Sequence, residues 1–367
     1  MSDVVLVSTI GEGERRVGRL TLNTPRILNS LDAEMIEIML AKLLEWAEDD
    51  SIAAVYIDGE GEKAFCAGGD VHELRRSSIE NPGGPCTYAE NFFAREYQMN
   101  YALFTYPKPV ICWGHGVVMG GGMGVMAGCS HRVVSERTRI GMPEITIALF
   151  PDVGGSYFLN RTPGMIGRFL SLTSVHINAT DALYANLGDV FLAHEQRHSV
   201  VEALASGPWS SDAAANTAIV DEILGMEATV DQPLGVIEPL MPQINALMAG
   251  DDLNDISDRL LGYEGDNVWL QKARDGFAHG SKLAACWIFR QLNDSANYSL
   301  KEVFDTELRL GANIMRHPEF AEGVRALLVD KDRQPKWQFA TVQDVPMDVL
   351  ESFFSEPSGA PNMHYPW

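Results

Sequence analysis

The order of hydrophobic and polar residues divides the chain into two parts of different character. In the first part, short apolar runs alternate with amphipathic segments. Four of these runs have the length and composition of β-strands: Val4–Ile10, Val17–Leu22, Ala53–Ile57 and Val110–Trp113. Helices are predicted from Asp32, a favourable N-cap, to about Glu48, and over Tyr88–Tyr106. This alternation predicts an α/β fold in which helices cover a sheet.

The second part, from about residue 180, has an almost wholly helical pattern. Six helical segments are predicted there: Thr180–Gly188, His194–Ala205, Asp212–Leu224, Leu234–Met248, Val268–Gln291 and Ser299–Arg316. We therefore expect a catalytic core over residues 1–205 and a helical C-terminal region over residues 206–367 that packs on it. The proline-rich tail, Ser355–Trp367, is expected to be loosely ordered.

Two glycine-rich turns each follow a strand-like run and precede a helix-like segment. The first lies in Phe65–Asp70 and the second in Met119–Gly124. Free backbone N–H groups at such places favour developing negative charge, and two that converge on one oxygen make an oxyanion hole. Tight packing of a strand on a helix is the structural alternative, because glycine also suits it. The second turn lacks the dinucleotide GxGxxG spacing, and the chain has no Walker-type phosphate loop. A further strand pair is predicted at Arg132–Ser135 and Thr138–Ile140.

Composition narrows the class of protein. Of the 367 residues, 46% are hydrophobic, which is enough for a substantial core and excludes global disorder. A formal net charge of -22 argues against nucleic-acid binding and against adhesion to an anionic membrane surface. The five cysteines are scattered and form no zinc-binding or disulfide pattern, and no run reaches membrane-spanning length. These features favour a cytoplasmic protein with no bound metal.

The segment Gly141–Gly155 carries the most informative chemistry. It sets two carboxylates, Glu144 and Asp152, in an almost wholly apolar run, and a proline stands just before each of them. Apolar surroundings resist ionisation of a carboxyl group, which tunes it for proton transfer near neutral pH. The alternative is that both acids cap a helix or pair with an arginine.

These pieces together resemble the crotonase (enoyl-CoA hydratase/isomerase) superfamily. The fold implied is one of repeated ββα units with a mostly helical C-terminal part. Within the superfamily, the chain is most similar to 3-hydroxyisobutyryl-CoA hydrolases. Besides Leu22–Leu31 and the two glycine turns, five stretches carry the resemblance: Phe92–Tyr97, Met142–Gly155, Leu159–Gly164, Pro318–Asp332 and Pro335–Trp337.

The resemblance implies roles for particular residues. The backbone amides of Gly69 and Gly121 would bind the thioester oxygen, Glu144 would be the principal catalytic acid, and Asp152 the second. Glu96 would contact the substrate. Further substrate contacts are implied for Gly68, Asp70, Gly120, Leu28 and Arg26.

The implied reaction is hydrolysis of a short β-hydroxyacyl-CoA thioester. Coenzyme A is then part of the substrate, no separate cofactor is expected, and a homo-oligomer stays open because the superfamily often forms trimers. Hydratases of the superfamily carry a second glutamate where this chain has Gly124, so ordinary hydration is disfavoured. A dienoyl-CoA isomerase shares the Glu and Asp spacing and remains the nearest rival. The alternative of another class is a non-catalytic acyl-CoA-binding or scaffold protein.

Overall fold

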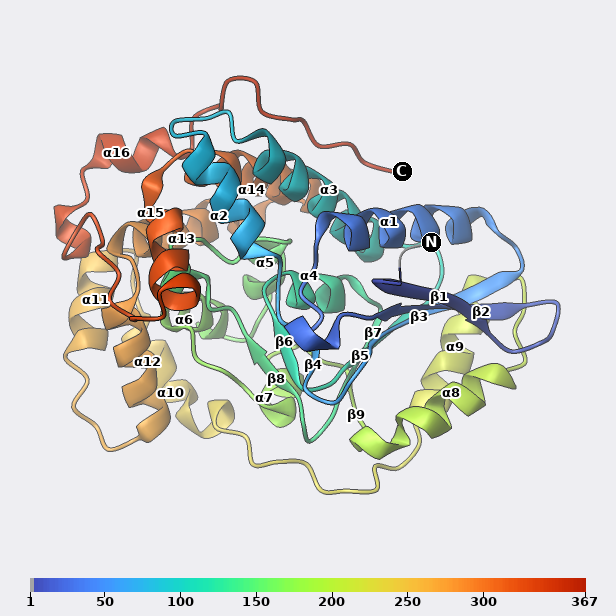
Figure 1. Cartoon of the computed structure of the whole chain (residues 1–367). Coiled ribbons are helices and arrows are strands. Elements are labelled where there is room, and N and C mark those ends of the chain that lie inside the picture. The colour runs from blue at the N-terminus through green and yellow to red at the C-terminus, as the bar shows by residue number, and fades with distance from the viewer. Residues whose placement is uncertain (1–2) are drawn as a thin grey trace.

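The computed structural model describes residues 3–367, and its centre is a six-stranded sheet (Figure 1). The strands run in the order β1-β2-β3-β5-β7-β9; β1 is antiparallel to β2, and every other neighbouring pair is parallel. Their bounds are Val5–Ile10, Arg16–Leu22, Ile52–Gly59, Val110–Gly114, His131–Val134 and Val190–Phe191. All eight residues of β3 are buried, as expected of a central strand in a parallel sheet that is covered on both faces.

A second, three-stranded parallel sheet has the order β4-β6-β8. Its strands are Ala64–Cys66, Val117–Met119 and Arg139–Gly141. Both strands predicted within residues 132–140 are confirmed, but they do not pair with each other, because they lie in different sheets. His131 of β7 pairs with Ile111 of the large sheet, whereas Arg139 of β8 pairs with Val117 of the small one.

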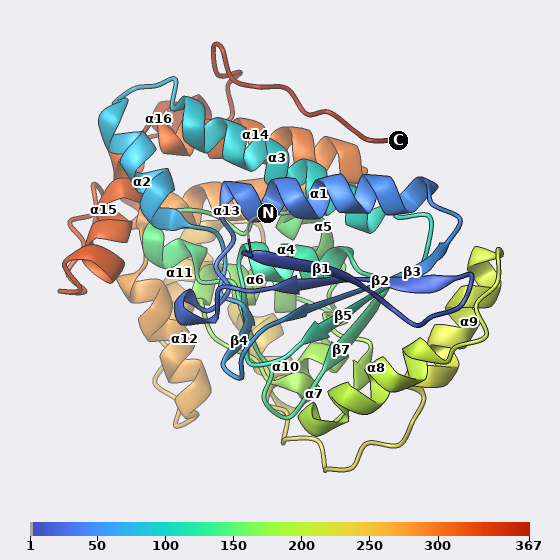
Figure 2. The ribbon, with the colours of Figure 1, turned by 45° about the vertical axis from the view of Figure 1, so that its right-hand side comes forward.

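Helices cover both faces of the large sheet (Figure 2). α1 (Ala33–Glu48) and α3 (Thr87–Phe104) lie on one face, and α8 (Arg197–Ala205) and α9 (Ala213–Leu224) lie on the other. The Asp32 carboxylate accepts a hydrogen bond from Met35 N at 2.8 Å, which confirms the predicted N-cap. The remaining helices of the first part are short: α2 (Val71–Glu80), α4 (Gly121–Gly128), α5 (Gly155–Leu159), α6 (Ile166–Thr173) and α7 (Ala179–Tyr184).

The C-terminal part is helical, and no strand follows Phe191 in the described residues. Its helices are α10 (Ile237–Leu247), α11 (Leu253–Leu261), α12 (Val268–His279), α13 (Lys282–Asp294), α14 (Leu300–Met315), α15 (Pro318–Val324) and α16 (Met347–Ser352). The predicted helix Val268–Gln291 is two helices, because Ser281 begins a new one by accepting a hydrogen bond from Ala284 N. The α/β fold with a mostly helical C-terminal part is thus confirmed, while the division at residue 205 stays a prediction.

The C-terminal tail lies along α3 and α14 and ends near α1 (Figure 1). The Tyr365 hydroxyl donates to Asp305 Oδ1 at 2.6 Å, and Trp367 Nε1 donates to Thr105 Oγ1 at 2.7 Å. These contacts hold a segment that its proline content predicted to be loosely ordered. None of the helices in residues 3–367 combines the length and apolar character that crossing a membrane requires.

Asp58, the buried acid of β3, ties α8 to the sheet. Its carboxylate accepts hydrogen bonds from Arg19 Nη2 of β2 and Arg197 Nη2 of α8, each at 2.6 Å, and from Thr21 Oγ1. Since Asp58 is fully buried, its charge depends on these two arginines.

We predict that Asp58→Asn lowers the free energy of unfolding by roughly 2–3 kcal/mol, because it removes the anion between two cations that are only partly exposed. Urea unfolding followed by circular dichroism measures this change. Asp294→Asn is the matched control, since Asp294 forms an exposed pair with Arg290 and its loss should cost less than about 0.5 kcal/mol. Equal effects of the two substitutions would contradict the prediction.

Candidate active site

The three strands of the small sheet all end at one pocket. β4 leads into the turn Ala67–Asp70 and then α2, β6 leads through Gly120 into α4, and β8 leads into the 3-10 helix η2 (Glu144–Ile147). Because parallel strands present their carboxyl ends at the same edge of a sheet, the two predicted glycine turns and the predicted acid segment meet there. The sequence spreads these segments over about eighty residues, and the sheet joins them.

The pocket has a volume of about 500 Å³ and is mostly apolar. Eight of the predicted site residues line it: Gly68, Gly69, Asp70, Glu96, Gly120, Gly121, Glu144 and Asp152. The lining also includes Leu327 and Leu328 from a π-helical turn, η5 (Arg325–Val329), which belongs to the C-terminal part. A largely apolar cavity with a few convergent polar groups is typical of a small-molecule binding site.

The two glycine turns approach each other closely. A Cβ atom placed on Gly121 would lie 3.5 Å from Gly69 N, and only 2.4 Å from Glu96 Oε1. Within residues 3–367, the amides of Gly69 and Gly121 donate no hydrogen bond to another group. Two neighbouring free N–H groups in a pocket have the character of an oxyanion hole.

Glu144 begins η2 and is 3% exposed. Burial, and then the charge of Asp152, raise the pKa of its carboxyl group well above the usual range. Its Oε1 lies beside the second glycine turn, 3.3 Å from a Cβ placed on Gly120, and its Oε2 has no hydrogen-bond partner among the described residues. Glu144 therefore caps no helix through its side chain and pairs with no arginine, which removes the structural alternative for this residue.

Asp152 lies in the loop between η2 and α5 and is 4% exposed. Burial raises the pKa of its carboxyl group to about 7, although a hydrogen bond from Tyr97 opposes that rise. The Tyr97 hydroxyl donates to Asp152 Oδ2 at 2.7 Å. A carboxyl group with a pKa near 7 can give up or take a proton at neutral pH.

Glu96 projects from α3 into the same pocket and is fully buried. Burial and then the charge of Asp152 raise the pKa of its carboxyl group, and its Oε1 is unpaired within the described residues. A buried, unpaired and neutral carboxyl group can donate a hydrogen bond to a bound molecule as well as accept one.

The remaining predicted substrate contacts divide into two groups. Gly68, Asp70 and Gly120 line the pocket, and the Asp70 carboxylate also caps α2 by accepting from His72 N at 3.1 Å. Arg26 and Leu28 lie outside the pocket lining and border a neighbouring groove together with Lys63. Leu28 nevertheless positions the first glycine turn, because its carbonyl accepts from Ala67 N at 3.0 Å.

The space beside Gly124 is filled by Val153. This residue belongs to the loop of residues 148–154 between η2 and α5, which also holds Asp152 and is called the acid loop below. A Cβ atom placed on Gly124 would lie 2.4 Å from Val153 Cβ and 3.1 Å from Asn100 Nδ2. No second carboxylate can project from this point of α4 while Val153 keeps its place. Val153 itself has φ = 55°, a left-handed conformation that a β-branched residue rarely adopts.

Sequence reasoning missed two groups that act on Asp152. Tyr97 ends the stretch Phe92–Tyr97 that carries the family resemblance, but no pattern distinguishes its hydroxyl. Glu307 of α14 went unnoticed; it is fully buried, and burial raises the pKa of its carboxyl group to about 8. It accepts hydrogen bonds from Gly154 N at 2.8 Å and Ser156 N at 2.9 Å, directly after Asp152 in the chain.

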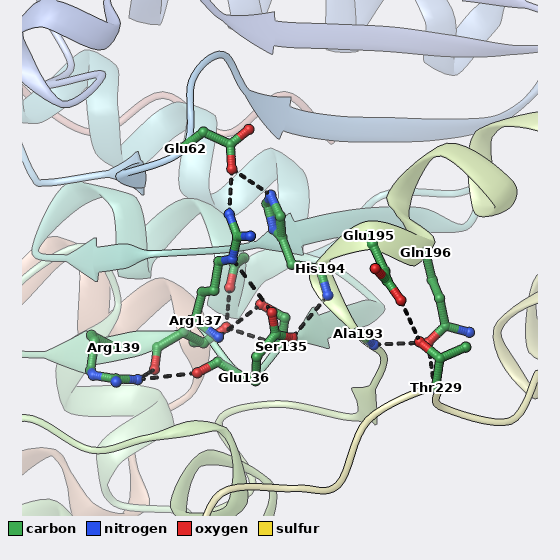
Figure 3. A network of polar contacts seen from close by, with 12 residues as sticks. Glu62, Ser135, Glu136, Arg137, Arg139, Ala193, His194, Glu195, Gln196 and Thr229 are labelled. Carbon is green, nitrogen blue, oxygen red and sulfur yellow. Dashed lines mark hydrogen bonds and ion pairs between the residues drawn. The ribbon is translucent and has the colours of Figure 1, made fainter.

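His115 and Cys66, the other reactive side chains near the glycine turns, lie outside the pocket lining. His115 Nε2 contacts Gly61 O at 2.8 Å, and burial lowers the pKa of its imidazole to about 4. Its ring packs against His194, which belongs to a separate polar network with Glu62 and Arg137 (Figure 3). Burial raises the pKa of the Cys66 thiol to about 12, so it is no nucleophile at neutral pH.

Known proteins are similar to this chain over most of its length. The family model for enoyl-CoA hydratase/isomerase matches residues 17–354. The 3-hydroxyisobutyryl-CoA hydrolases of Gallus gallus and Homo sapiens, both named mitochondrial, are 33% and 34% identical over 338 residues, covering 92% of this chain and 86% of each relative. A carnitinyl-CoA dehydratase structure from Mycobacterium thermoresistibile is 31% identical, with a TM-score of 0.87 and 99% of each chain covered. An enoyl-CoA hydratase structure from Rhodobacter sphaeroides 2.4.1 is also 31% identical, with a TM-score of 0.85 over 99% of this chain and 100% of that one.

The fold and the pocket thus define a crotonase-type protein. The chain belongs to the enoyl-CoA hydratase/isomerase family, and the predicted crotonase-like fold is confirmed. Among its relatives are the 3-hydroxyisobutyryl-CoA hydrolases that the sequence motifs indicated.

We predict that Gly124→Ala loosens the acid loop, because the new methyl group displaces Val153. The Gly155 amide, which donates to Asp152 O at 2.7 Å, should lose at least about tenfold of its hydrogen-exchange protection. Gly128→Ala in the same helix is the control, since its methyl group meets Leu103 Cβ at 2.7 Å instead. The prediction is wrong if both variants leave the Gly155 amide equally protected.

Proposed function

We propose that this protein is an acyl-CoA thioester hydrolase that converts 3-hydroxyisobutyryl-CoA to 3-hydroxyisobutyrate and coenzyme A, a step of valine degradation. The observation that carries this proposal is the meeting of two free glycine amides with the buried pair Glu144 and Asp152 in one apolar pocket. The names of relatives that cover most of the chain support it.

In the proposed mechanism the Gly69 and Gly121 amides hold the thioester oxygen as it becomes an anion. Glu144 and Asp152 share one negative charge, because two buried carboxylates side by side resist ionising together. The ionised member takes a proton from the attacking water as the new C–O bond forms. When the C–S bond breaks, the protonated member gives its proton to the departing sulfur. Glu96 accepts or donates a hydrogen bond at the 3-hydroxyl group of the acyl chain.

Coenzyme A belongs to the substrate, and we propose no separate cofactor or metal. Leu327 and Leu328 line the same pocket as the acids, and their apolar side chains suit the branched acyl chain. Assembly of several copies of the chain remains a prediction. The relatives' names place those proteins in mitochondria, which does not support the prediction of a cytoplasmic protein.

Hydration is the second candidate, because two solved structures that match 99% of this chain are named as a dehydratase and a hydratase. The crowding of Gly124 by Val153 disfavours it, since the water of a hydratase is held between two glutamates. Two further alternatives are isomerisation of a dienoyl-CoA and a non-catalytic role. A thiol-release assay on 3-hydroxyisobutyryl-CoA, 3-hydroxypropionyl-CoA and crotonyl-CoA, with chromatography of the acyl-CoA products, separates hydrolysis from hydration.

We predict that Glu144→Gln abolishes thiol release, with a loss of at least about 10³-fold, while acyl-CoA binding stays measurable by calorimetry. The amide keeps the shape of the side chain but can neither take nor give the proton. Glu136→Gln is the control, because Glu136 is a carboxylate outside the pocket lining. Full turnover by Glu144→Gln would remove Glu144 from the mechanism.

The turnover rate should also fall as the pH drops below about 7. Burial raises the pKa of Asp152 to about 7, so protonation below that pH removes the charge of the acid pair. An isolated aspartate would keep its charge down to about pH 4. The measurement is kcat from pH 5 to 9, with circular dichroism at each pH to confirm folding. A rate that stays constant down to pH 5 would contradict this assignment.

A further inference from the structure

Two residues from separate helices restrain Asp152. Tyr97 of α3 donates its hydroxyl to Asp152 Oδ2 at 2.7 Å. Glu307 of α14 binds the backbone that follows, through the amides of Gly154 and Ser156. The side chain and the main chain of the acid loop are therefore held independently. In residues 3–367, the other carboxylate oxygen, Oδ1, accepts no hydrogen bond from another side chain.

The ring of Tyr97 is itself fixed. It stacks on Phe93 with ring centroids 5.7 Å apart and tilts against Phe304 at 5.8 Å. Phe304 stands one turn before Glu307 on α14, so the same helix holds both the tyrosine ring and the acid loop. Tyr97 is fully buried, and its hydroxyl has little freedom to leave Asp152.

Apart from the Tyr97 hydroxyl and the backbone of Asp152 itself, the groups that face Asp152 do not favour its anion. Glu144 approaches from η2, Glu96 from α3 and Glu307 from α14, and each is a buried acid. In residues 3–367, no lysine or arginine forms an ion pair with Asp152. The hydrogen bond from the Tyr97 hydroxyl is thus the side-chain interaction that distinguishes Asp152 from Glu144 and Glu96.

We propose that Tyr97 is a positioning residue for thioester hydrolysis, and that its hydroxyl makes Asp152, rather than Glu144, the member of the acid pair that carries the negative charge. This inference rests on the proposed function and deepens it. Asp152 then takes the proton from water, and Glu144 gives its proton to the departing sulfur. Atoms and charge balance as in the proposed hydrolysis. Water gives one proton to Asp152 and its hydroxyl to the acyl carbon, and Glu144 gives one proton to the released thiol.

The test is Tyr97→Phe, which removes the hydroxyl and keeps the ring. We expect kcat to fall roughly 10- to 100-fold while KM changes less than about twofold, because a hydrogen bond to a charged group is lost and the pocket is not. The acidic limb of the kcat profile should move about one pH unit upward, since losing a hydrogen bond to the anion raises the pKa of Asp152.

Tyr106→Phe is the matched control. It also removes a hydroxyl that donates at 2.7 Å, in this case to Leu43 O, far from the pocket lining. Its kcat and pH profile should equal those of the unsubstituted protein. If Tyr97→Phe also leaves kcat and the acidic limb of the pH profile unchanged, the inference is overturned.

A double substitution separates positioning from packing. If Tyr97 acts through Asp152, then Tyr97→Phe should cost less than about twofold in kcat when Asp152→Asn is already present. A further tenfold loss in the double variant would mean that Tyr97 acts by another route, and would overturn the inference.

An infrared titration of the Asp152 carboxyl band, identified by its loss in Asp152→Asn, needs no substrate. Tyr97→Phe should raise the midpoint of this titration by about one pH unit, and an unchanged midpoint would overturn the inference. If the unsubstituted protein releases no thiol from any substrate of the panel, the proposed function fails. The titration would still decide whether Tyr97 places the charge on Asp152.

Discussion

The structure of the active site depends on four buried carboxyl groups that share one region without a cation. Glu96, Glu144, Asp152 and Glu307 come from four segments, and in residues 3–367 none of them pairs with a lysine or arginine. They resist ionising together, because burial, and then the charge of Asp152, raise the pKa of the other three. Burial therefore favours the protonated form of most of them. The site can then supply a proton to a bound molecule as readily as it can accept one.

Much of this site could be predicted from the sequence, because its chemistry lies in short continuous motifs. The glycine turns and the acids of residues 144 and 152 each follow a strand, and the parallel order of the strands brings them together. Tyr97 and Glu307 could not be predicted in this way. Their roles depend on the packing of α3 against α14, two helices separated by about two hundred residues, and a buried tyrosine looks the same in sequence whether or not its hydroxyl is used.

The fold was predicted less evenly than the site. Asp32 was recognised as an N-cap because its signal is local. The placement of β7 and β8 in different sheets was missed, since two short apolar runs a few residues apart read as a hairpin. The break between α12 and α13 was also missed, because the apolar pattern continues through Gly280 and Ser281, and only the cap reveals the new start.

The small sheet has a consequence for how such proteins diversify. Its three strands deliver the two free glycine amides and the buried Glu144 as separate segments, each at the end of its own strand. A substitution at one strand end can therefore change the reaction of the acyl group, while the glycine amides that we propose to bind the thioester oxygen stay in place. Relatives of similar fold that are named hydrolase, dehydratase and hydratase are what such modular inheritance would produce.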